Sequence, residues 1–286
     1  MFTQNEWIEH ILLNASDPWT EVEGERGSAR SRHPAFSDKA VRDAMRLLVD
    51  RRGIEEVVFG RAGTATPSFV NGPPQYKSPN LKLEFDVARA NQILDAAGWQ
   101  RAADGVRAKG GTRLKFVFVA NISAQRQKTQ AIVKDACGKA GIEIEIKALP
   151  SAMMFGSDPA NPDNYKKFWS DMLVYAFPAL LPDPGFLMSQ FCSWEASQRA
   201  NQWGSGNIAR WRNDEYDRTF KAAQAELDPV KRAALFIRMN DILCTDGHVI
   251  PVVSRAGVCC MNSRLVAPLT PWDANTSTLA HWHREA

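Results

Sequence analysis

The chain has 286 residues, with 35 basic and 32 acidic side chains and a formal net charge of +3 at pH 7. Hydrophobic residues make up 44% of it and charged residues 23%, a globular composition that excludes a disordered, collagen-like or disulfide-stapled chain. Because the two signs of charge are interspersed, we expect no nucleic-acid partner. The most apolar uncharged stretch, Met172 to Leu181, is too short to cross a bilayer.

The first hundred residues predict one strand and two helices. Ile8 to Leu13 can form a short strand, and the charged, Gly- and Pro-containing residues 17–36 are typical of a connector. Ser37 is a favourable N-cap for a helix whose apolar positions recur at helical spacing, namely Val41, Ala44, Met45 and Leu48. Residues 60–79 predict a long loop, and Asp86 predicts the start of a second helix that ends at Gly98.

The next fifty residues predict a strand, a helix and a second strand. Gly110-Gly111 favours a tight turn in a β-ribbon whose longer strand contains residues 114–118. Ser123 then caps a helix that ends at Gly141, and residues 142–147 alternate apolar and charged side chains. A strand, a long helix and a strand form a βαβ unit with parallel strands. The fold class is therefore predicted to be α/β.

Periodicity fades between residues 150 and 211, where Pro, Asp, Asn and aromatic residues accumulate. Only residues 172–177 predict a strand there, and an irregular segment of this length is usually functional. We therefore expect the binding site in this segment. Two helices that begin at Asn213 and Asp228 follow, and then two strands over 249–253 and 258–261, with Pro251 at an edge or a bulge.

No motif for catalysis or for a cofactor is found. The sequence lacks G-x-S-x-G, H-E-x-x-H, a Walker loop and a G-x-G-x-x-G after a strand, and His281 with His283 is too small a set for zinc. We expect no metal, no cofactor and no enzymatic activity. The five cysteines are expected to be mostly buried thiols, and Arg126 to Lys128 to lie on a solvated helix face.

Several segments, taken in order, resemble one protein family. They are residues 37–42, 48–51, 85–99, 157–163, 182–184 and 210–217. Together they are similar to the extracytoplasmic solute-binding proteins of peptide- and nickel-type ABC importers, family 5. The resemblance covers nearly the whole chain and corresponds to the carboxy-terminal half of such a protein. It implies the second lobe of a two-lobed periplasmic-binding-protein fold, with short strands left over from the first lobe.

The resemblance also implies a domain organisation and a function. Residues 1–36 would be the end of the first lobe and the crossover, residues 37–266 the second α/β lobe with its ligand loop at 150–211, and residues 267–286 the return to the first lobe. Such proteins close around a peptide-like or other small polar solute by a hinge motion and deliver it to ABC permease subunits. A monomeric, periplasmic protein is expected, although no export signal is visible at Met1.

The resemblance further implies where the ligand lies. Dipeptide binders of the family carry a Trp and an Asp before their Asp-Pro segment, and the spacing from Asp183 places these at Phe177 and Leu180. Because Leu180 cannot pair with an ammonium group, a free dipeptide is not the expected ligand. The predicted ligand-binding residues are four aromatic residues and one possible anion contact, namely Tyr175, Phe177, Trp194, Trp203 and Arg210. Asp183 is expected to cap the helix after Pro184.

Two alternatives remain open at this stage. The first is a hydrolase that uses residues 150–211, which we call the aromatic segment, as an active site, with His248 or His33 as its base. The second is a truncated gene product without a function of its own, whose exposed domain faces would promote aggregation.

Overall fold

The computed structural model describes residues 2–158, 160–258, 260–268 and 278–285. Its main sheet contains β1 (Phe2–Leu13), β4 (Gly63–Ala65), β8 (Lys115–Asn121), β9 (Glu143–Leu149), β10 (Met172–Pro178) and β11 (Val249–Val258). The strand order is β4-β11-β1-β10-β8-β9.

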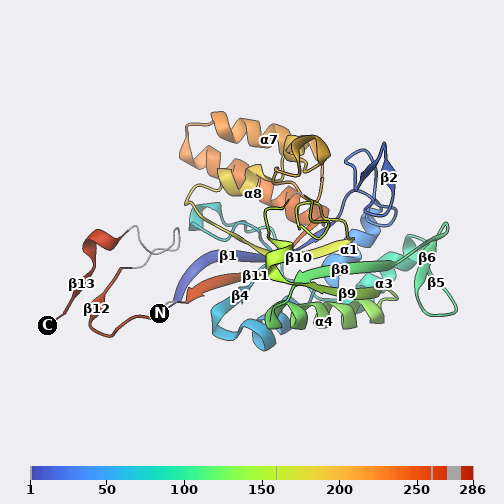
Figure 1. Ribbon diagram of the computed structural model, residues 1–286, viewed down its shortest axis with the longest axis horizontal. Coiled ribbons are helices and arrows are strands. Elements are labelled where there is room, and N and C mark those ends of the chain that lie inside the picture. Colours follow the sequence, from blue (N-terminus) through green and yellow to red (C-terminus); the bar gives the residue numbers. More distant parts are fainter. Residues whose placement is uncertain (1, 159, 259, 269–277, 286) are drawn as a thin grey trace.

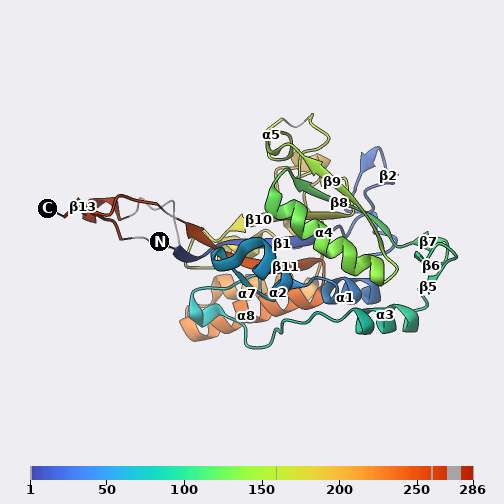
Figure 2. The same cartoon turned by 90° about the horizontal axis from the view of Figure 1, so that it is seen from below.

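Helices cover both faces of this sheet (Figures 1 and 2). The α-helices are α1 (Lys39–Leu47), α2 (Arg51–Ile54), α3 (Val87–Ala96), α4 (Ala124–Lys139), α5 (Ser151–Met154), α6 (Gly185–Ser189), α7 (Asp214–Ala225) and α8 (Pro229–Asp246). Helices α1, α2 and α4 pack on one face, and α7 and α8 pack on the other. The mixed α/β fold is as predicted.

Short elements lie around this core. They are the hairpin β2 (Glu21–Val22) and β3 (Glu25–Arg26), the ribbon β5 (Gln100–Arg101), β6 (Arg107–Lys109) and β7 (Thr112–Arg113), and the pair β12 (Leu265–Val266) and β13 (His283–Arg284). A π-helical turn, Glu55–Phe59, continues α2, and 3-10 turns occur at Gly60–Ala62, Pro74–Tyr76, Ser193–Glu195, Arg199–Asn201 and Leu279–His281. Strands β12 and β13 lie away from the rest, beyond the N-terminal end of β1 (Figure 1).

The predicted βαβ unit is present. Strands β8 and β9 pair in parallel from Lys115–Glu143 to Asn121–Leu149, and α4 connects them. Strand β10 pairs in parallel with β8 on the other side. The carboxyl ends of these three strands therefore meet at one edge of the sheet.

Strand β1 lies in the middle of the sheet and is longer than the predicted strand. It pairs antiparallel with β10, from Trp7–Pro178 to Leu13–Met172, and antiparallel with β11 on its other side. Because both of its edges are paired, residues 8–13 are part of this lobe's core. The relation of the other residues of 1–36 to a first lobe stays a prediction.

Two sequence expectations need correction. The N-cap of α1 is Asp38 and not Ser37, because the Asp38 carboxylate accepts a hydrogen bond from the Ala40 N–H at 2.9 Å. The strand predicted over 249–253 extends to Val258 as β11 because it stays paired with β1, whereas the second strand predicted over 258–261 is wrong for Cys260 and Met261, which lie in no strand, and residue 259 lies outside the described residues. The bulge expected at Pro251 is confirmed, since the register with β1 shifts between the pairs made by Glu9 and His10.

Most other local predictions are confirmed. Asp86, Asn213 and Asp228 each cap the helix that follows them. The loop predicted over 60–79 is wrong for Gly63–Ala65, which form β4 and pair with β11. The part that follows packs against α8, where the Asn240 side chain accepts the N–H groups of Phe69 and Val70. Three of the cysteines, Cys137, Cys192 and Cys244, are buried free thiols, whereas Cys260 is exposed and Cys259 lies outside the described residues.

The predicted connector over 17–36 is held to the sheet by Asp171. This buried carboxylate accepts hydrogen bonds from Nε2 of His33 at 3.0 Å, from Nε1 of Trp19 at 2.8 Å and from the Val117 N–H at 2.7 Å. Nδ1 of His33 accepts the Phe36 N–H at 2.9 Å, so the proton of the neutral ring is on Nε2. Asp171, the residue directly before β10, thus fixes the path of the connector.

His10 is a titratable group in the centre of β1. Its ring packs on Phe69 and Tyr175, with centroid distances of 5.1 and 4.5 Å. Nδ1 donates to the Ile8 carbonyl at 2.9 Å, and Nε2 has no partner among the described residues. Burial lowers the pKa of His10 to about 4, so the folded protein holds this ring neutral.

We predict that acid destabilises the protein through His10. The unfolded chain binds this proton below pH ~6.5 and the folded chain only near pH 4, so stability is complete above pH ~6.5 and falls as the pH decreases. The expected loss in the free energy of unfolding between pH 7 and pH 4 is about 3 kcal/mol. Urea unfolding at several pH values measures it.

The matched variants are His10→Leu and His283→Gln, of which the second changes an exposed histidine. His10→Leu should reduce the pH dependence by about 3 kcal/mol, and His283→Gln should leave it unchanged. An equal pH dependence in wild type and His10→Leu would show that His10 is not the group involved.

Candidate ligand-binding site

Exposed apolar side chains gather where the parallel strands end. Ile122 follows β8, Met153 and Phe155 follow β9, and Leu180, Leu181 and Phe186 follow β10. Trp7 of β1, the partner of Pro178 in the sheet, is also exposed. We call these seven residues the carboxyl-edge face. In open α/β sheets this is the edge at which ligands bind.

A cavity of about 250 Å³ lies beside this face. Its walls come from the second half of β10 and from the segments before and after this strand. Its lining residues are Tyr165, Lys166, Tyr175, Phe177, Phe186, Ser189, Gln190, Glu195, Gly204, Ser205, Gly206 and Ile208. We call it the β10 cavity. Its aromatic walls with a few amide, hydroxyl and carboxylate groups are typical of a small-molecule pocket.

Two of the five predicted ligand residues, Tyr175 and Phe177, come together in the β10 cavity. They lie two residues apart on one strand, so their side chains share a face of the sheet. The Tyr175 ring also contacts Tyr165, with a centroid distance of 5.5 Å, and burial raises the pKa of its hydroxyl. Leu180, the position expected to lack a carboxylate, is 48% exposed at the same edge.

The other three predicted residues do not line the β10 cavity. Trp194 is 47% exposed and packs on Phe220. Trp203 packs on Trp169 and Lys167, and its indole N–H is buried without a partner in the described part of the chain.

Arg210 is the predicted anion contact. It is buried, and its guanidinium donates to the main-chain carbonyls of Lys167 at 2.6 Å and Ile208 at 3.1 Å. Burial lowers its pKa to about 10. These contacts join the part of the aromatic segment around Arg210 to the part around Lys167. A role of Arg210 in binding a ligand stays a prediction.

A buried ionic group near the carboxyl-edge face was missed from sequence. Glu9 is 1% exposed and binds Nε and Nη2 of Arg126 at 2.6 and 3.2 Å, with Arg255 at 3.5 Å. Arg126 also donates to the Asn121 side chain. The expectation of a solvated helix face is therefore wrong for Arg126. Glu9 inside the apolar run of β1 was the available signal, because a buried carboxylate needs a cation.

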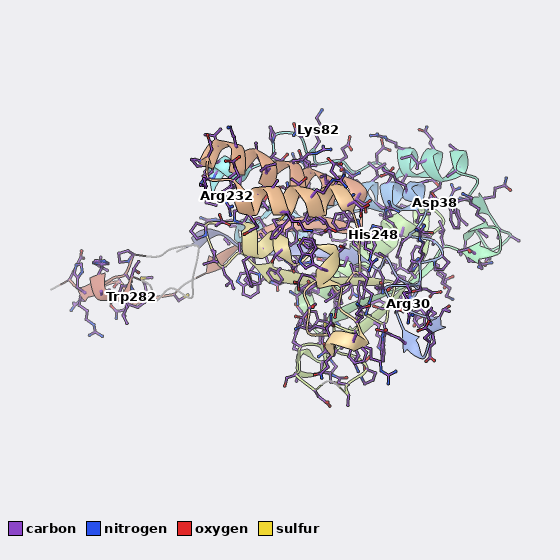
Figure 3. The ribbon with its side chains drawn as sticks, turned by 90° about the horizontal axis from the view of Figure 1, so that it is seen from above. Arg30, Asp38, Lys82, Arg232, His248 and Trp282 are labelled. Carbon is purple, nitrogen blue, oxygen red and sulfur yellow. The ribbon has the colours of Figure 1, made fainter. Side chains whose placement is uncertain are left out.

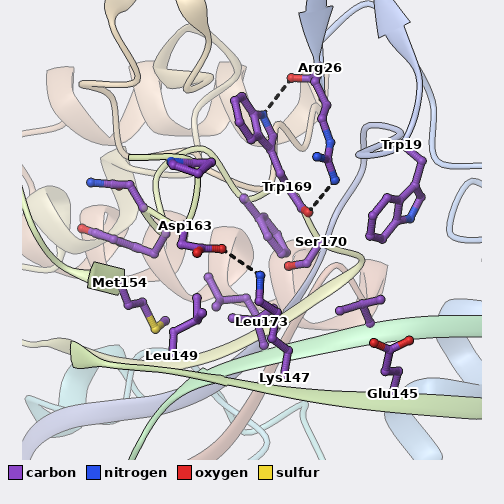
Figure 4. A pocket seen from close by; sticks show the side chains of 16 residues that line it. Trp19, Arg26, Glu145, Lys147, Leu149, Met154, Asp163, Trp169, Ser170 and Leu173 are labelled. Carbon is purple, nitrogen blue, oxygen red and sulfur yellow. Dashed lines mark hydrogen bonds and ion pairs between the residues drawn. The ribbon is translucent and has the colours of Figure 1, made fainter. Parts of the chain in front are cut away.

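A second cavity, of about 470 Å³, lies on the sheet face between β8, β9 and the aromatic segment (Figure 4). At one end the Arg26 guanidinium lies between the rings of Trp19 and Trp169, at 5.0 and 5.4 Å from their centroids. On another side Lys147 pairs with Asp163 at 2.8 Å. Tyr165 lines both this cavity and the β10 cavity, so the aromatic segment forms a wall of each.

The hydrolase alternative finds no support. Both ring nitrogens of His33 are occupied by Asp171 and the Phe36 N–H. His248 is buried just after the C-terminal end of α8 (labelled in Figure 3), and its Nδ1 contacts the Asp246 carboxylate at 2.5 Å. Neither histidine lines any of the cavities described here, and a general base must reach its substrate.

The described residues contain neither a candidate metal site nor a candidate membrane span. Within them, no three His, Cys, Asp or Glu side chains are grouped so that they could hold a metal ion. No helix among them is both long and apolar enough to cross a membrane.

The chain belongs to the bacterial extracellular solute-binding proteins, family 5. The sequence profile described as the middle part of this family matches residues 3–199, which is more than half of the chain. The members of this family are binding proteins and not enzymes.

Individual relatives agree with this membership. Protein XP55 of Streptomyces lividans is 27% identical over 216 residues, which cover 73% of this chain and 36% of that protein. The oligopeptide-binding protein of Thermus thermophilus, solved with a pentapeptide, has a TM-score of 0.78 at 23% identity and covers 96% of this chain and 47% of that one. NikZ of Campylobacter jejuni, solved with Ni(L-His), has a TM-score of 0.76 at 19% identity, with 99% and 53% covered.

These similarities confirm the predicted periplasmic-binding-protein fold. The chain spans about a third of the length of the curated relative and about half of the two solved chains.

The buried ionic group yields a prediction. Glu9→Gln should lower the free energy of unfolding by about 3 kcal/mol, because Arg126 is left in a buried place without its counter-charge. The double variant Glu9→Gln/Arg126→Met should recover part of this loss. Denaturant unfolding of the single and double variants measures the coupling between the two residues.

The matched control is Asp135→Asn, which removes the exposed partner of Lys139 and should cost about 0.5 kcal/mol or less. If Glu9→Gln costs no more than this control, the Glu9–Arg126 pair does not stabilise the lobe.

Proposed function

We propose that this chain provides one wall of the ligand cleft in the substrate-binding component of an ABC import system. The carboxyl-edge face carries the proposal, because seven large apolar side chains are exposed at the one edge where an open α/β sheet binds ligands. Apolar patches of this kind mark binding surfaces in soluble proteins. A solute and an opposing lobe would cover them together.

The ligand we propose is a peptide-like or other small polar solute. In the β10 cavity, Tyr175, Phe177 and Phe186 provide apolar surface, and Gln190 and Glu195 provide polar groups, which suits a side chain with a polar end. Tyr175 and Phe177 are the residues that we place in contact with the ligand. Trp194 would lie at the rim, and Trp203 and Arg210 would position the segment that contains Gly204 to Ile208.

The mechanism would be closure without bond chemistry. A hinge motion would bring the opposing lobe onto the carboxyl-edge face, bury the solute, and present the closed form to ABC permease subunits. The protein would act as a monomer outside the cytoplasmic membrane, in the periplasm, and without nucleic acid. Family membership and the carboxyl-edge face support this mechanism.

We predict weak binding by this 286-residue chain. Calorimetry with tripeptides to pentapeptides should give dissociation constants weaker than about 10 µM, because a single wall buries one side of the ligand and leaves the other in water. NMR titration at millimolar peptide should shift the signals of residues 175–186. Nanomolar affinity, or shifts confined to other parts of the chain, would contradict the proposal.

A second prediction concerns Leu180. Leu180→Asp would place a carboxylate where the family's dipeptide binders pair with the peptide amino terminus. It should tighten the binding of a peptide with a free amino terminus about tenfold, as a charge-assisted hydrogen bond does. The N-acetylated peptide should gain nothing.

Leu180→Asn is the matched control, since it has the same shape without the charge. NMR titrations of both variants with both peptides provide the measurement. Equal affinities of the two variants for the free peptide would contradict the placement of the ligand amino terminus at residue 180.

A further inference from the structure

A groove of about 780 Å³ lies at the β4 edge of the main sheet. One side is formed by β4 and β11 and the other by residues 74–83, and the lining residues are Arg52, Thr64, Ala65, Thr66, Pro67, Ser68, Asn71, Pro74, Lys77, Ser78, Leu81, Lys82, Leu83, Ser254 and Ala256. We call it the β4 groove. It shares no residue with the two cavities described above.

The charge in the β4 groove is positive and uncompensated. Arg52, Lys77 and Lys82 are exposed along it, and no Asp or Glu lines it. Among the described residues, none forms a hydrogen bond or ion pair with these three side chains. Lys82 projects from the surface of the molecule in Figure 3. The cations are therefore available to a ligand.

Glu55 and Glu56, which follow α2 in the chain, do not line the groove, and two other acidic groups close to it are already occupied. Asp241, behind the wall of the groove, accepts hydrogen bonds from Ser78 at 2.5 Å and from Asn80 at 2.6 Å. Glu84, just past the groove, pairs with Arg89 at 3.3 Å. The chain from Val57 to Leu83 contains no acidic residue at all. The excess of positive charge thus belongs to this whole segment.

The uncharged groups of the groove add donors. Thr66 and Ser68 already donate their hydroxyl protons to Asn71 and to the Val70 carbonyl. By contrast, the main chain of residues 81–83 and the hydroxyl of Thr64 form no hydrogen bond within the described part of the chain. Three cations with free N–H and O–H groups favour an oxygen-rich anion.

We propose that the β4 groove binds a phosphate-bearing anion. Arg52 would bind the phosphate oxygens with its planar guanidinium, and Lys77 and Lys82 would add point charges. The phosphate could belong to a free small molecule or to a lipid headgroup, which share this chemistry. The site is independent of the proposed solute cleft, since it lies on other residues.

Pyrophosphate is the probe, titrated by calorimetry into the full chain at constant ionic strength. The groove variant is Arg52→Gln/Lys77→Gln/Lys82→Gln. The matched control, Lys128→Gln/Arg218→Gln/Lys231→Gln, removes the same three charges from exposed positions that line none of the cavities described. Circular dichroism verifies that both variants fold.

The expected result is binding by wild type that weakens with added salt, a loss of at least tenfold in the groove variant, and less than a twofold change in the control. An equal loss in both variants, or no binding by wild type at millimolar pyrophosphate, would overturn the proposal for free phosphate compounds.

Vesicles separate the two sources of phosphate. A headgroup ligand would be supported if the wild-type protein sediments with phosphatidylglycerol vesicles and not with phosphatidylcholine vesicles. The groove variant should lose this vesicle binding, and the control variant should retain it. If the wild-type protein binds neither pyrophosphate nor phosphatidylglycerol vesicles, the proposal of a phosphate site in the β4 groove is wrong. Peptide titrations of the groove variant should match wild type, so the outcome does not depend on the solute cleft.

Discussion

The position of β1 between β10 and β11 is the constraint on which the rest of this lobe depends. It pairs with both neighbours along residues 7–12 and thereby joins the βαβ unit to the C-terminal strand and helices. Successive side chains of a strand point to opposite faces, so this pairing sends Glu9 toward Arg126 and His10 toward Tyr175. Two ionisable residues that would be unfavourable alone are thus held in the core, one by an ion pair and one by remaining neutral.

The same pairing determines where a ligand can bind. Because β8, β9 and β10 are parallel, their carboxyl ends gather the segments that carry the exposed apolar side chains. Strand β1 runs in the opposite direction and adds Trp7 to that edge. The aromatic segment continues after β10 and folds back onto the sheet. There the Arg210 side chain binds the Lys167 carbonyl, which lies before β10, and the Asn207 side chain binds the Cys192 carbonyl. A rigid sheet therefore positions a loop-built pocket.

The two regions that we assign to ligands differ in their chemistry. The β10 cavity has four aromatic side chains in its walls and lies beside an apolar face, as a cleft that closes over a solute requires. The β4 groove is lined by cations without counter-charges and by free donors, and it lies at the edge of the sheet formed by a three-residue strand. Apolar burial would provide affinity in the first, whereas charge would provide it in the second, so salt should affect the two sites differently.

The sequence by itself determined the elements whose signals are local. The alternation over 142–147, the helix from Ser123 to Gly141 and the caps Asp86, Asn213 and Asp228 depend on neighbours within a few residues. Family resemblance added the fold. Tyr175 and Phe177, two of the five predicted ligand residues, line one cavity, and their contact with a ligand stays a prediction. Only the tertiary structure decided that Arg126 is paired with Glu9, that Trp194 lies outside the cavity, and that Arg52, Lys77 and Lys82 line one groove. The physical reason is that burial and charge pairing depend on residues far apart in the chain, which no local pattern brings together.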